Sequence, residues 1–258
     1  MKRGSRLHPL APIAMAVLTT SWMAACGVDT VGPGVEGEVG EAEGWSAYTF
    51  DQLRLQREQA NLSFLEFVTT PGLRAGLYHQ QRRFPGGFIS HPDHVVYYVV
   101  NGNGTLSVEG TDYALAPGTT FFVRAQAEHQ FYSDITDIDL LVVFGDGAQS
   151  PDDPEVMSYL REDLLVAQNP NENVLNFVLE TSMLDLAMYT LPRDLDGAGE
   201  MAHGRDEVMI VVRGGSRLDL GPAGINVGDL SIVFVEAGLV HRFRLISDDL
   251  EILLIRAP

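Results

Sequence analysis

Cysteine is almost absent from this 258-residue chain, in which Cys26 is the single example. No disulfide can therefore form within the chain, even in a compartment that favours one. No other thiol is present to serve as a catalytic nucleophile. A phosphate-binding loop is also missing, because the segment Gly102-Asn103-Gly104 precedes a strand-like run where such a loop would precede a helix.

Basic residues are scarce. The chain has 17 lysines and arginines against 35 aspartates and glutamates, for a formal net charge of −18. A field of this sign repels phosphate backbones and anionic lipid surfaces. Nucleic acid is therefore not an expected partner, and solubility is the simplest reason for the acidity.

Long apolar runs are missing too, with one exception near the N-terminus. Residues 10–25 are mostly apolar or small, follow a basic start and end directly before Cys26. This order predicts an export signal over residues 1–25. It also resembles a bacterial lipoprotein signal, which implies that Cys26 is lipidated. An ordinary cleaved signal followed by a chance cysteine is the alternative.

The expected mature protein is lipid-anchored and lies in the bacterial periplasm or cell envelope. Without residues 1–25 it keeps 14 basic and 35 acidic residues, a net charge of −21. No second apolar stretch reaches the ~20 residues that a membrane-spanning helix needs, so the lipid is the only expected attachment. Residues 26–60 are expected to hold the anchor, a flexible Gly- and Glu-rich acidic linker and a lead-in to the fold.

From residue 61 the sequence has the pattern of an all-β protein. Short runs rich in Val, Phe and Tyr are separated by Gly, Pro and Asn. These runs predict strands at residues 64–68, 73–78, 95–100, 105–108, 120–123, 140–144, 174–179, 184–189 and 250–255. A short helix is expected at residues 155–167, inside a connector that spans residues 146–173.

The chain repeats itself at an offset of 112 residues. This offset relates His91 to His203 and His129 to His241. It also relates a glycine, a phenylalanine and an acidic residue of each copy: Gly102 to Gly214, Phe131 to Phe243 and Asp139 to Glu251. Because a unit of this size is a domain and not a solenoid element, we expect two tandem domains, at residues 61–145 and 174–258.

The two copies differ at a position that matters for chemistry, where the second has Glu207 and the first has Val95. Side chains alternate between faces in an extended segment, so His203, Arg205 and Glu207 are expected to share a face. A barrel would bring His241 to the same interior. Two imidazoles and one carboxylate can hold a divalent metal and leave coordination positions open.

These residues resemble the motifs of the cupin superfamily, which are His-x-His-x(3–4)-Glu-x(6)-Gly and Gly-x(5)-Pro-x-Gly-x(2)-His. The second copy has most of the expected positions: His203, Glu207, Gly214, Gly238 and His241. The first copy has fewer: His91, Gly102, Pro117, Gly118 and His129. The duplication makes the chain similar to a bicupin of the conserved-barrel type. This implies two double-stranded β-helix (jelly-roll) barrels joined by a short, partly helical connector.

The resemblance implies a metal site in the C-terminal barrel only, with His203, Glu207 and His241 as ligands. Iron, manganese, nickel and zinc all remain open as the divalent ion. The superfamily's first histidine position falls at Met201 in this copy and at Ile89 in the other.

The first copy is expected to hold a degenerate site at most. It keeps His91 and His129, and Asp93 has the parity of an inward-facing residue that can replace the lost carboxylate. A purely structural role for the two histidines is the alternative. His94 has the opposite parity and is expected to face outward.

The resemblance implies a protein that binds or acts on a small oxygen-bearing molecule, by dioxygenase-, isomerase- or lyase-like chemistry. The alternative is a non-catalytic bicupin that binds a small molecule or a carbohydrate and has degenerate metal sites. Whether the protein is an enzyme stays open, and no catalytic residue is assigned. Cupins often pair through sheet edges, which makes a homodimer possible, although no residue here indicates one.

Overall fold

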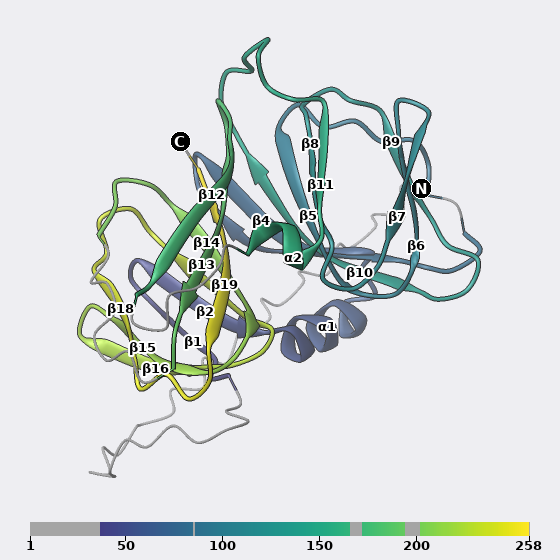
Figure 1. Cartoon of the computed structure of the whole chain (residues 1–258). Helices are drawn as coiled ribbons and strands as arrows, with labels where there is room; N and C mark the ends of the chain where they lie inside the picture. The colour runs from purple at the N-terminus through teal and green to yellow at the C-terminus, as the bar shows by residue number, and fades with distance from the viewer. Residues whose placement is uncertain (1–36, 85, 166–171, 194–201, 258) are drawn as a thin grey trace, which may run out of the picture.

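The computed structural model of the chain describes residues 37–84, 86–165, 172–193 and 202–257. The regular secondary structure of these residues is almost entirely β-strand, which confirms the predicted all-β class (Figure 1). The expected signal at residues 1–25, Cys26 and Met201 lie outside the described residues.

The N-terminal unit consists of a six-stranded and a three-stranded antiparallel sheet. The larger sheet has the order β11-β8-β5-β10-β4-β3 and the smaller has the order β7-β6-β9. The bounds are β3 (Phe64–Thr69), β4 (Leu73–Gln80), β5 (His94–Asn101), β6 (Gly104–Val108), β7 (Thr111–Leu115), β8 (Thr120–Val123), β9 (His129–Tyr132), β10 (Ile138–Gly145) and β11 (Val156–Tyr159).

The C-terminal unit repeats this plan with a seven-stranded and a three-stranded sheet. Their orders are β1-β2-β17-β14-β19-β13-β12 and β16-β15-β18. The bounds are β1 (Gly40–Ala42), β2 (Trp45–Thr49), β12 (Val174–Glu180), β13 (Asp185–Leu191), β14 (Glu207–Arg213), β15 (Ser216–Leu220), β16 (Ala223–Val227), β17 (Ser231–Val235), β18 (His241–Arg244) and β19 (Leu250–Arg256). The strand orders of the two large sheets match when β17 is taken as the counterpart of β8, β14 of β5 and β19 of β10.

The two outermost strands at one edge of the large C-terminal sheet, β1 and β2, come from the N-terminal part of the chain. Strand β2 pairs with β17, with Trp45 opposite Val235 and Thr49 opposite Ser231. Figure 1 shows β1 and β2, in purple, among the green and yellow strands of the C-terminal unit. Residues 40–49, which fall within the predicted linker and lead-in at residues 26–60, therefore form strands that complete the sheet of a unit more than a hundred residues downstream. The unpaired backbone edge of β17 forms hydrogen bonds with β2, which directly follows a segment whose composition predicted flexibility.

Helix α1 (Phe50–Gln59) leads from β2 back to the N-terminal unit. The Thr49 side chain caps it by accepting a hydrogen bond from the backbone N–H of Gln52 at 3.2 Å. Leu53 is fully buried and packs against strands of both units. The helix therefore joins the two units as well as connecting them along the chain.

The connector also differs from its prediction. Residues 156–159, expected to be helical, form β11 and pair with β8, where Val156 lies opposite Val123. In the described part of the connector, a single helical turn follows, α2 (Arg161–Leu164). Strand β11 forms backbone hydrogen bonds with the edge of β8, as β2 does with the edge of β17. This tertiary pairing overrides the local preference of residues 156–159 for a helix.

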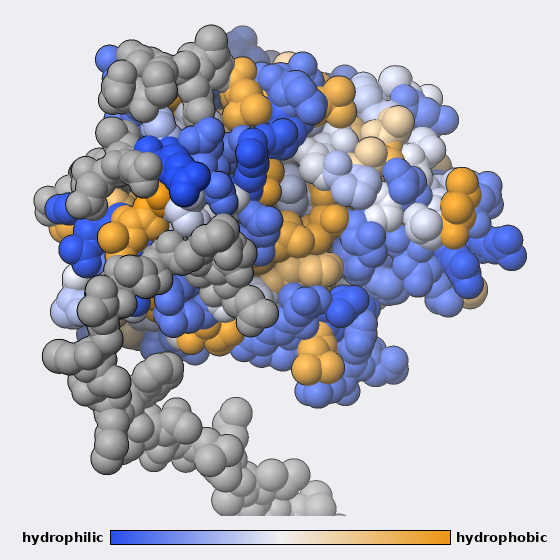
Figure 2. Space-filling view, turned by 60° about the horizontal axis from the view of Figure 1, so that its bottom comes forward, coloured by the Kyte–Doolittle hydropathy of each residue, from blue (hydrophilic) through white to orange (hydrophobic). Residues whose placement is uncertain are grey.

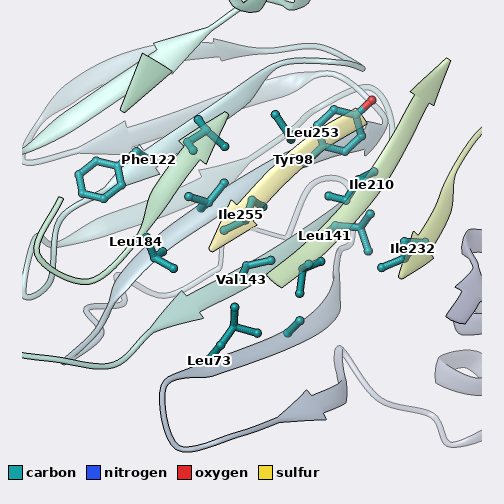
Figure 3. Packing of buried hydrophobic residues seen from close by; sticks show 14 of the residues in the cluster. Leu73, Tyr98, Phe122, Leu141, Val143, Leu184, Ile210, Ile232, Leu253 and Ile255 are labelled. Atoms are coloured by element: carbon teal, nitrogen blue, oxygen red, sulfur yellow. The ribbon is translucent and has the colours of Figure 1, made fainter. Parts of the chain in front are cut away.

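The two large sheets face one another, and the main hydrophobic core lies between them. Figure 3 shows this core, in which Leu141 and Val143 of β10 point toward Leu253 and Ile255 of β19. Each large sheet packs its other face against its own small sheet through a separate apolar cluster. The order of layers is thus small sheet, large sheet, large sheet, small sheet.

This layering explains why the long strands are apolar on both faces. Val95 and Tyr97 of β5 point into the N-terminal unit, whereas Val96 and Tyr98 point into the core between the units. His94 lies on the same face of the strand as Val96, so the prediction that it lies on the opposite face from His91 is correct. The expectation that it faces outward is wrong, because that face is covered by the second unit and His94 is fully buried.

Two glycines at the ends of β5 and β14 are required by close approach. Gly102 has φ 91°, and a Cβ there would lie 2.1 Å from the carbonyl oxygen of Asp137. Gly214 has φ 89°, and a Cβ would lie 2.7 Å from the carbonyl oxygen of Asp249. The repeated glycine therefore marks a place where the chain leaves the large sheet for the small one.

The surface is mostly hydrophilic, with hydrophobic residues in separate patches, as Figure 2 shows for one face. Among the described residues, no helix has the length and apolar character needed to cross a membrane.

Candidate metal centre

The three predicted ligands of the C-terminal unit come from two strands and a bend. Glu207 is the first residue of β14 and His241 is the first residue of β18. His203 lies in a bent segment before β14, not in the extended strand that the sequence predicted. The structure nevertheless brings all three side chains together.

The geometry is that of three ligands around one point. Oε1 of Glu207 lies 3.3 Å from Nε2 of His203 and 3.6 Å from Nε2 of His241. One ligand atom from each residue lies within 4.8 Å of the others. Two ligands at ~2.1 Å from a common ion and ~90–110° apart are separated by about 3.0–3.4 Å. The two shorter distances are close to this range.

Backbone carbonyls fix the protonation of both imidazoles. Nδ1 of His203 donates to the carbonyl of Arg205 at 2.7 Å, and Nδ1 of His241 donates to the carbonyl of Leu239 at 3.0 Å. A carbonyl oxygen only accepts, so each Nδ1 carries the hydrogen and each neutral ring has a lone pair on Nε2. Both Nε2 atoms and Oε1 of Glu207 are buried without a hydrogen-bond partner. When both rings are neutral, three acceptor atoms therefore face one another without a hydrogen-bond donor between them.

An arginine that the sequence analysis missed holds the other carboxylate oxygen. Nε of Arg256, in the last strand, donates to Oε2 of Glu207 at 2.5 Å. Its guanidinium also lies over the ring of Phe177, 5.4 Å from the centroid. Arg256 is directly opposite Glu207 in the sheet. The signal available in the sequence was a charged residue, Arg256, directly after the mostly apolar run at residues 250–255.

The electrostatics favour an ionised carboxylate. Burial acts to raise the pKa of Glu207, but the contact with His203 and the charge of Arg256 bring this pKa below its ordinary value. The carboxylate contact raises the pKa of His203. Burial lowers the pKa of His241, which Glu207 only partly opposes. Glu207 is thus charged and His241 neutral at neutral pH.

Arg205 was expected to share the interior face with His203 and Glu207, but it does not. Its guanidinium is partly exposed and forms an ion pair with Asp185 of β13. The arginine that pairs with Glu207 is instead Arg256.

The N-terminal unit uses its corresponding histidine differently. Nδ1 of His129 donates to the carbonyl of Ala127 at 2.9 Å, just as His241 does to Leu239. Its Nε2, however, lies 2.6 Å from the hydroxyl of Tyr97, which donates to it. Tyr97 is the counterpart of Met209, so a hydrogen-bond donor satisfies His129 where the other unit has only acceptors.

Asp93 does not complete a second ligand set. Its carboxylate accepts a hydrogen bond from Arg74 at 2.6 Å. Within the described residues, the group of His203, Glu207 and His241 is the only one of three His, Cys, Asp or Glu side chains with metal-like spacing. The Arg74–Asp93 pair corresponds to Asp185–Arg205 with the two charges exchanged.

His94 belongs to a polar cluster between the units. Its Nδ1 accepts from the backbone N–H of Ala125 at 2.9 Å, so Nε2 donates to Asp153, also at 2.9 Å. Asp153 further accepts the hydroxyl of Ser182 at 2.5 Å. Burial opposes the ionisation of Asp153, but these hydrogen bonds lower its pKa to about 2. His94 is thus a structural residue.

Comparison with known proteins is consistent with this architecture. Residues 81–144 match the sequence family described as Cupin domain. The chain has the cupin fold. An uncharacterized protein of Streptomyces coelicolor, SCO3923, is 33% identical over 98 residues, which are 38% of this chain and 93% of that protein.

Solved structures agree over most of the chain. A cupin 2 conserved barrel domain protein from Leptotrichia buccalis has a TM-score of 0.65 at 13% identity and covers 86% of this chain and 98% of its own. Protein Ylba from E. coli has a TM-score of 0.59 at 14% identity, covering 87% and 95%. A variant of salicylate 1,2-dioxygenase from Pseudoaminobacter salicylatoxidans, in complex with gentisate, has a TM-score of 0.67 at 11% identity, covering 84% and 83%. At these identities the likeness establishes the fold.

Proposed function

We propose that the chain is a bicupin that binds one divalent metal ion at His203, Glu207 and His241. The observation that carries the proposal is the convergence of three buried side-chain atoms, none of which has a hydrogen-bond partner. Buried acceptors without a partner are costly, at about 1–3 kcal/mol each. A cation at their centre offsets this cost for all three.

A proton is the competing occupant. A proton on Nε2 of His203 would donate to Oε1 of Glu207, and the raised pKa of His203 is in keeping with this. It would still leave Nε2 of His241 without a partner at 3.6 Å from the same oxygen. One proton thus satisfies two of the three atoms, whereas one metal ion satisfies them all.

Two imidazoles and a carboxylate suit iron, manganese, nickel or zinc and leave further coordination positions free. A bound ion would supply Lewis acidity to a small oxygen-bearing molecule. The backbone carbonyls of Arg205 and Leu239 would hold the rings in the tautomer that binds metal. Arg256 would hold Glu207 so that Oε1 alone faces the ion. Dioxygenase-, isomerase- or lyase-like chemistry on such a molecule is the function that this site supports best.

A non-catalytic bicupin that binds a small molecule or carbohydrate is the second candidate. It is favoured by the Arg256–Glu207 pair, which already neutralises the carboxylate. In this case His203, Glu207 and Arg256 form a self-contained polar cluster.

The test is the metal content of protein purified without chelator or nickel resin. We expect about one equivalent of a transition metal in the wild type and none in Glu207→Gln, which keeps the size and one acceptor. Tyr97→Phe in the N-terminal unit is the matched control and should retain the metal. Folded, metal-free wild-type protein that cannot be reconstituted would rule out the metal centre and leave the non-catalytic reading.

We also propose that the protein is exported and anchored to a membrane by a lipid on Cys26. The support is the apolar run that directly precedes this single cysteine. Cys26→Ser should release the protein from the membrane fraction. Continued membrane attachment of this variant would refute the anchor without affecting the metal centre.

A further inference from the structure

The interior of the N-terminal unit contains a cavity of about 320 Å³. This volume is at the lower end of the ~300–1,000 Å³ that ligand pockets occupy. The lining is mainly aromatic and aliphatic, and it consists of Phe64, Arg74, Tyr78, Ile89, His91, Tyr97, Phe131, Val142 and Phe144. Five aromatic rings surround a space that is suited to a flat apolar molecule.

The cavity occupies the place of the metal centre in the other unit. Val95 replaces Glu207 at the offset of 112, and Phe144 replaces Arg256. The sheet register is the same, since Phe144 lies opposite Val95 just as Arg256 lies opposite Glu207. Two charged side chains have therefore been exchanged for two apolar ones, which removes a metal ligand and leaves an apolar interior.

His91 provides the free polar group of this cavity. Its ring packs edge-on against Phe144, with centroids 4.9 Å apart, and lies 5.4 Å from the ring of His129. Along the described chain, neither ring nitrogen of His91 has a hydrogen-bond partner, whereas His129 is bonded at both nitrogens. Burial, followed by the neighbouring His129, lowers the pKa of His91 to about 4. The neutral ring offers one donor and one acceptor.

Arg74 does not make the cavity a site for anions. Its guanidinium lies 4.7 Å from the centroid of Phe144 and is bound by Asp93 at 2.6 Å and Glu66 at 3.5 Å. Two carboxylates thus compensate a single positive charge. A negatively charged ligand would meet net negative charge at this rim, while a neutral ligand loses nothing.

We propose that this cavity is a metal-independent binding site for a neutral, flat aromatic molecule that carries a hydroxyl group. The rings of the lining cover the aromatic part of the ligand, and His91 exchanges a hydrogen bond with its hydroxyl. A hydroxyl both donates and accepts, which matches a neutral imidazole. The site is separate from the metal centre and stands if the metal centre fails.

The test is the binding of 2-naphthol to the purified protein in the presence of chelator, followed by the fluorescence of the ligand. We expect saturable binding of about one equivalent. The anion 2-naphthoate should bind at least tenfold more weakly, because of Asp93 and Glu66. Equal or tighter binding of 2-naphthoate would overturn the assignment to a neutral ligand.

A pair of matched variants locates the site. His91→Phe keeps the ring and removes the hydrogen bond, so 2-naphthol affinity should fall about fivefold or more, since a hydrogen bond contributes about 1 kcal/mol. His203→Phe is the same change at the corresponding position and should leave this affinity unaltered while it abolishes metal binding. Unchanged affinity in His91→Phe would place the ligand elsewhere and refute the proposal.

A second variant fills the space instead of removing a polar group. Val142→Phe should abolish 2-naphthol binding at any concentration within solubility. The thermal midpoint of this variant shows whether it is folded. If it does not fold, the comparison of His91→Phe with His203→Phe still decides the question. Binding of 2-naphthol to folded Val142→Phe at wild-type affinity would contradict the proposal.

Discussion

Replacement of Arg256 by methionine tests the metal centre through stability, without reference to any reaction. Glu207 is fully buried, and Nε of Arg256 is 2.5 Å from its Oε2. Methionine keeps much of the apolar contact with Phe177 but removes the charge. In metal-free protein the substitution leaves a buried carboxylate without its cation, for which the expected cost is about 3–5 kcal/mol.

Bound metal should reduce this penalty. At an effective dielectric of about 20, an arginine ~5 Å from a divalent ion repels it by several kcal/mol. Loss of the arginine removes this repulsion, although it also loosens the carboxylate, which costs about 10–100-fold in metal affinity, or ~1.4–2.7 kcal/mol. The repulsion is the larger effect. We therefore expect Arg256→Met to bind metal at least as tightly as the wild type and to recover part of its stability.

Urea unfolding at pH 7, with chelator and with saturating metal, gives the four free energies of the cycle. Because the coupling is reciprocal, any reduction of the penalty must appear as tighter metal binding, at ~1.4 kcal/mol for each factor of ten. Arg205→Met is the control, since its partly exposed pair with Asp185 is worth about 0–1 kcal/mol. An identical penalty with and without metal, or one below ~1 kcal/mol, would refute the reasoning.

Three further predictions concern other parts of the molecule. Trp45→Ala should lower the free energy of unfolding in urea by about 3–5 kcal/mol, because Trp45 is only 8% exposed in the core of the C-terminal unit. The control Val39→Ala, at an exposed position, should lower it by under ~0.5 kcal/mol. Equal, small effects of the two variants would mean that residues 37–49 behave as a linker. The pKa of Asp153, lowered to about 2 from an ordinary 3.8, means that its contribution to stability is present above pH ~4 and is lost as the pH falls toward 2. Asp153→Asn should therefore flatten the acid limb of a plot of stability against pH, and an unchanged limb would contradict this. The double variant Val95→Glu with Tyr97→Met should raise bound metal from one equivalent to two, as measured by metal analysis, and no gain in a folded variant would show that further residues are needed.

The sequence predicted the strands well because both faces of the large sheets are buried. Residues 95–100 are apolar at every position, residues 250–255 are apolar at every position except Glu251, and each run forms a strand of the core. The repeat was equally informative, since a shared offset fixed the order of elements in one unit from the other. These signals are local or internal to the chain, which is why they needed no structure.

The edge strands and Arg256 could not be predicted in the same way. Residues 45–49 follow a Gly- and Glu-rich segment and pair with β17, far away in sequence, so no local pattern announces them. Arg256 becomes a partner of Glu207 only through the register of β14 with β19. The outward placement of His94 failed for a related reason: parity predicts which face a side chain occupies, but not what covers that face.

A pair of inward histidines does not by itself indicate a metal in this fold. His129 and His241 have the same Nδ1–H bond to a backbone carbonyl, and each has a buried Nε2 whose lone pair faces the interior of its unit. What differs is the group that faces the lone pair. The Tyr97 hydroxyl has a proton to donate, so His129 is satisfied within the protein. Glu207, ionised beside Arg256, has none, so Nε2 of His241 is left without a hydrogen-bond donor. If the proposed metal centre is correct, the third group decides between a hydrogen bond and a metal. This is why the change expected to extend metal binding from one unit to both is the joint replacement of Tyr97 and Val95, and not a change of either histidine.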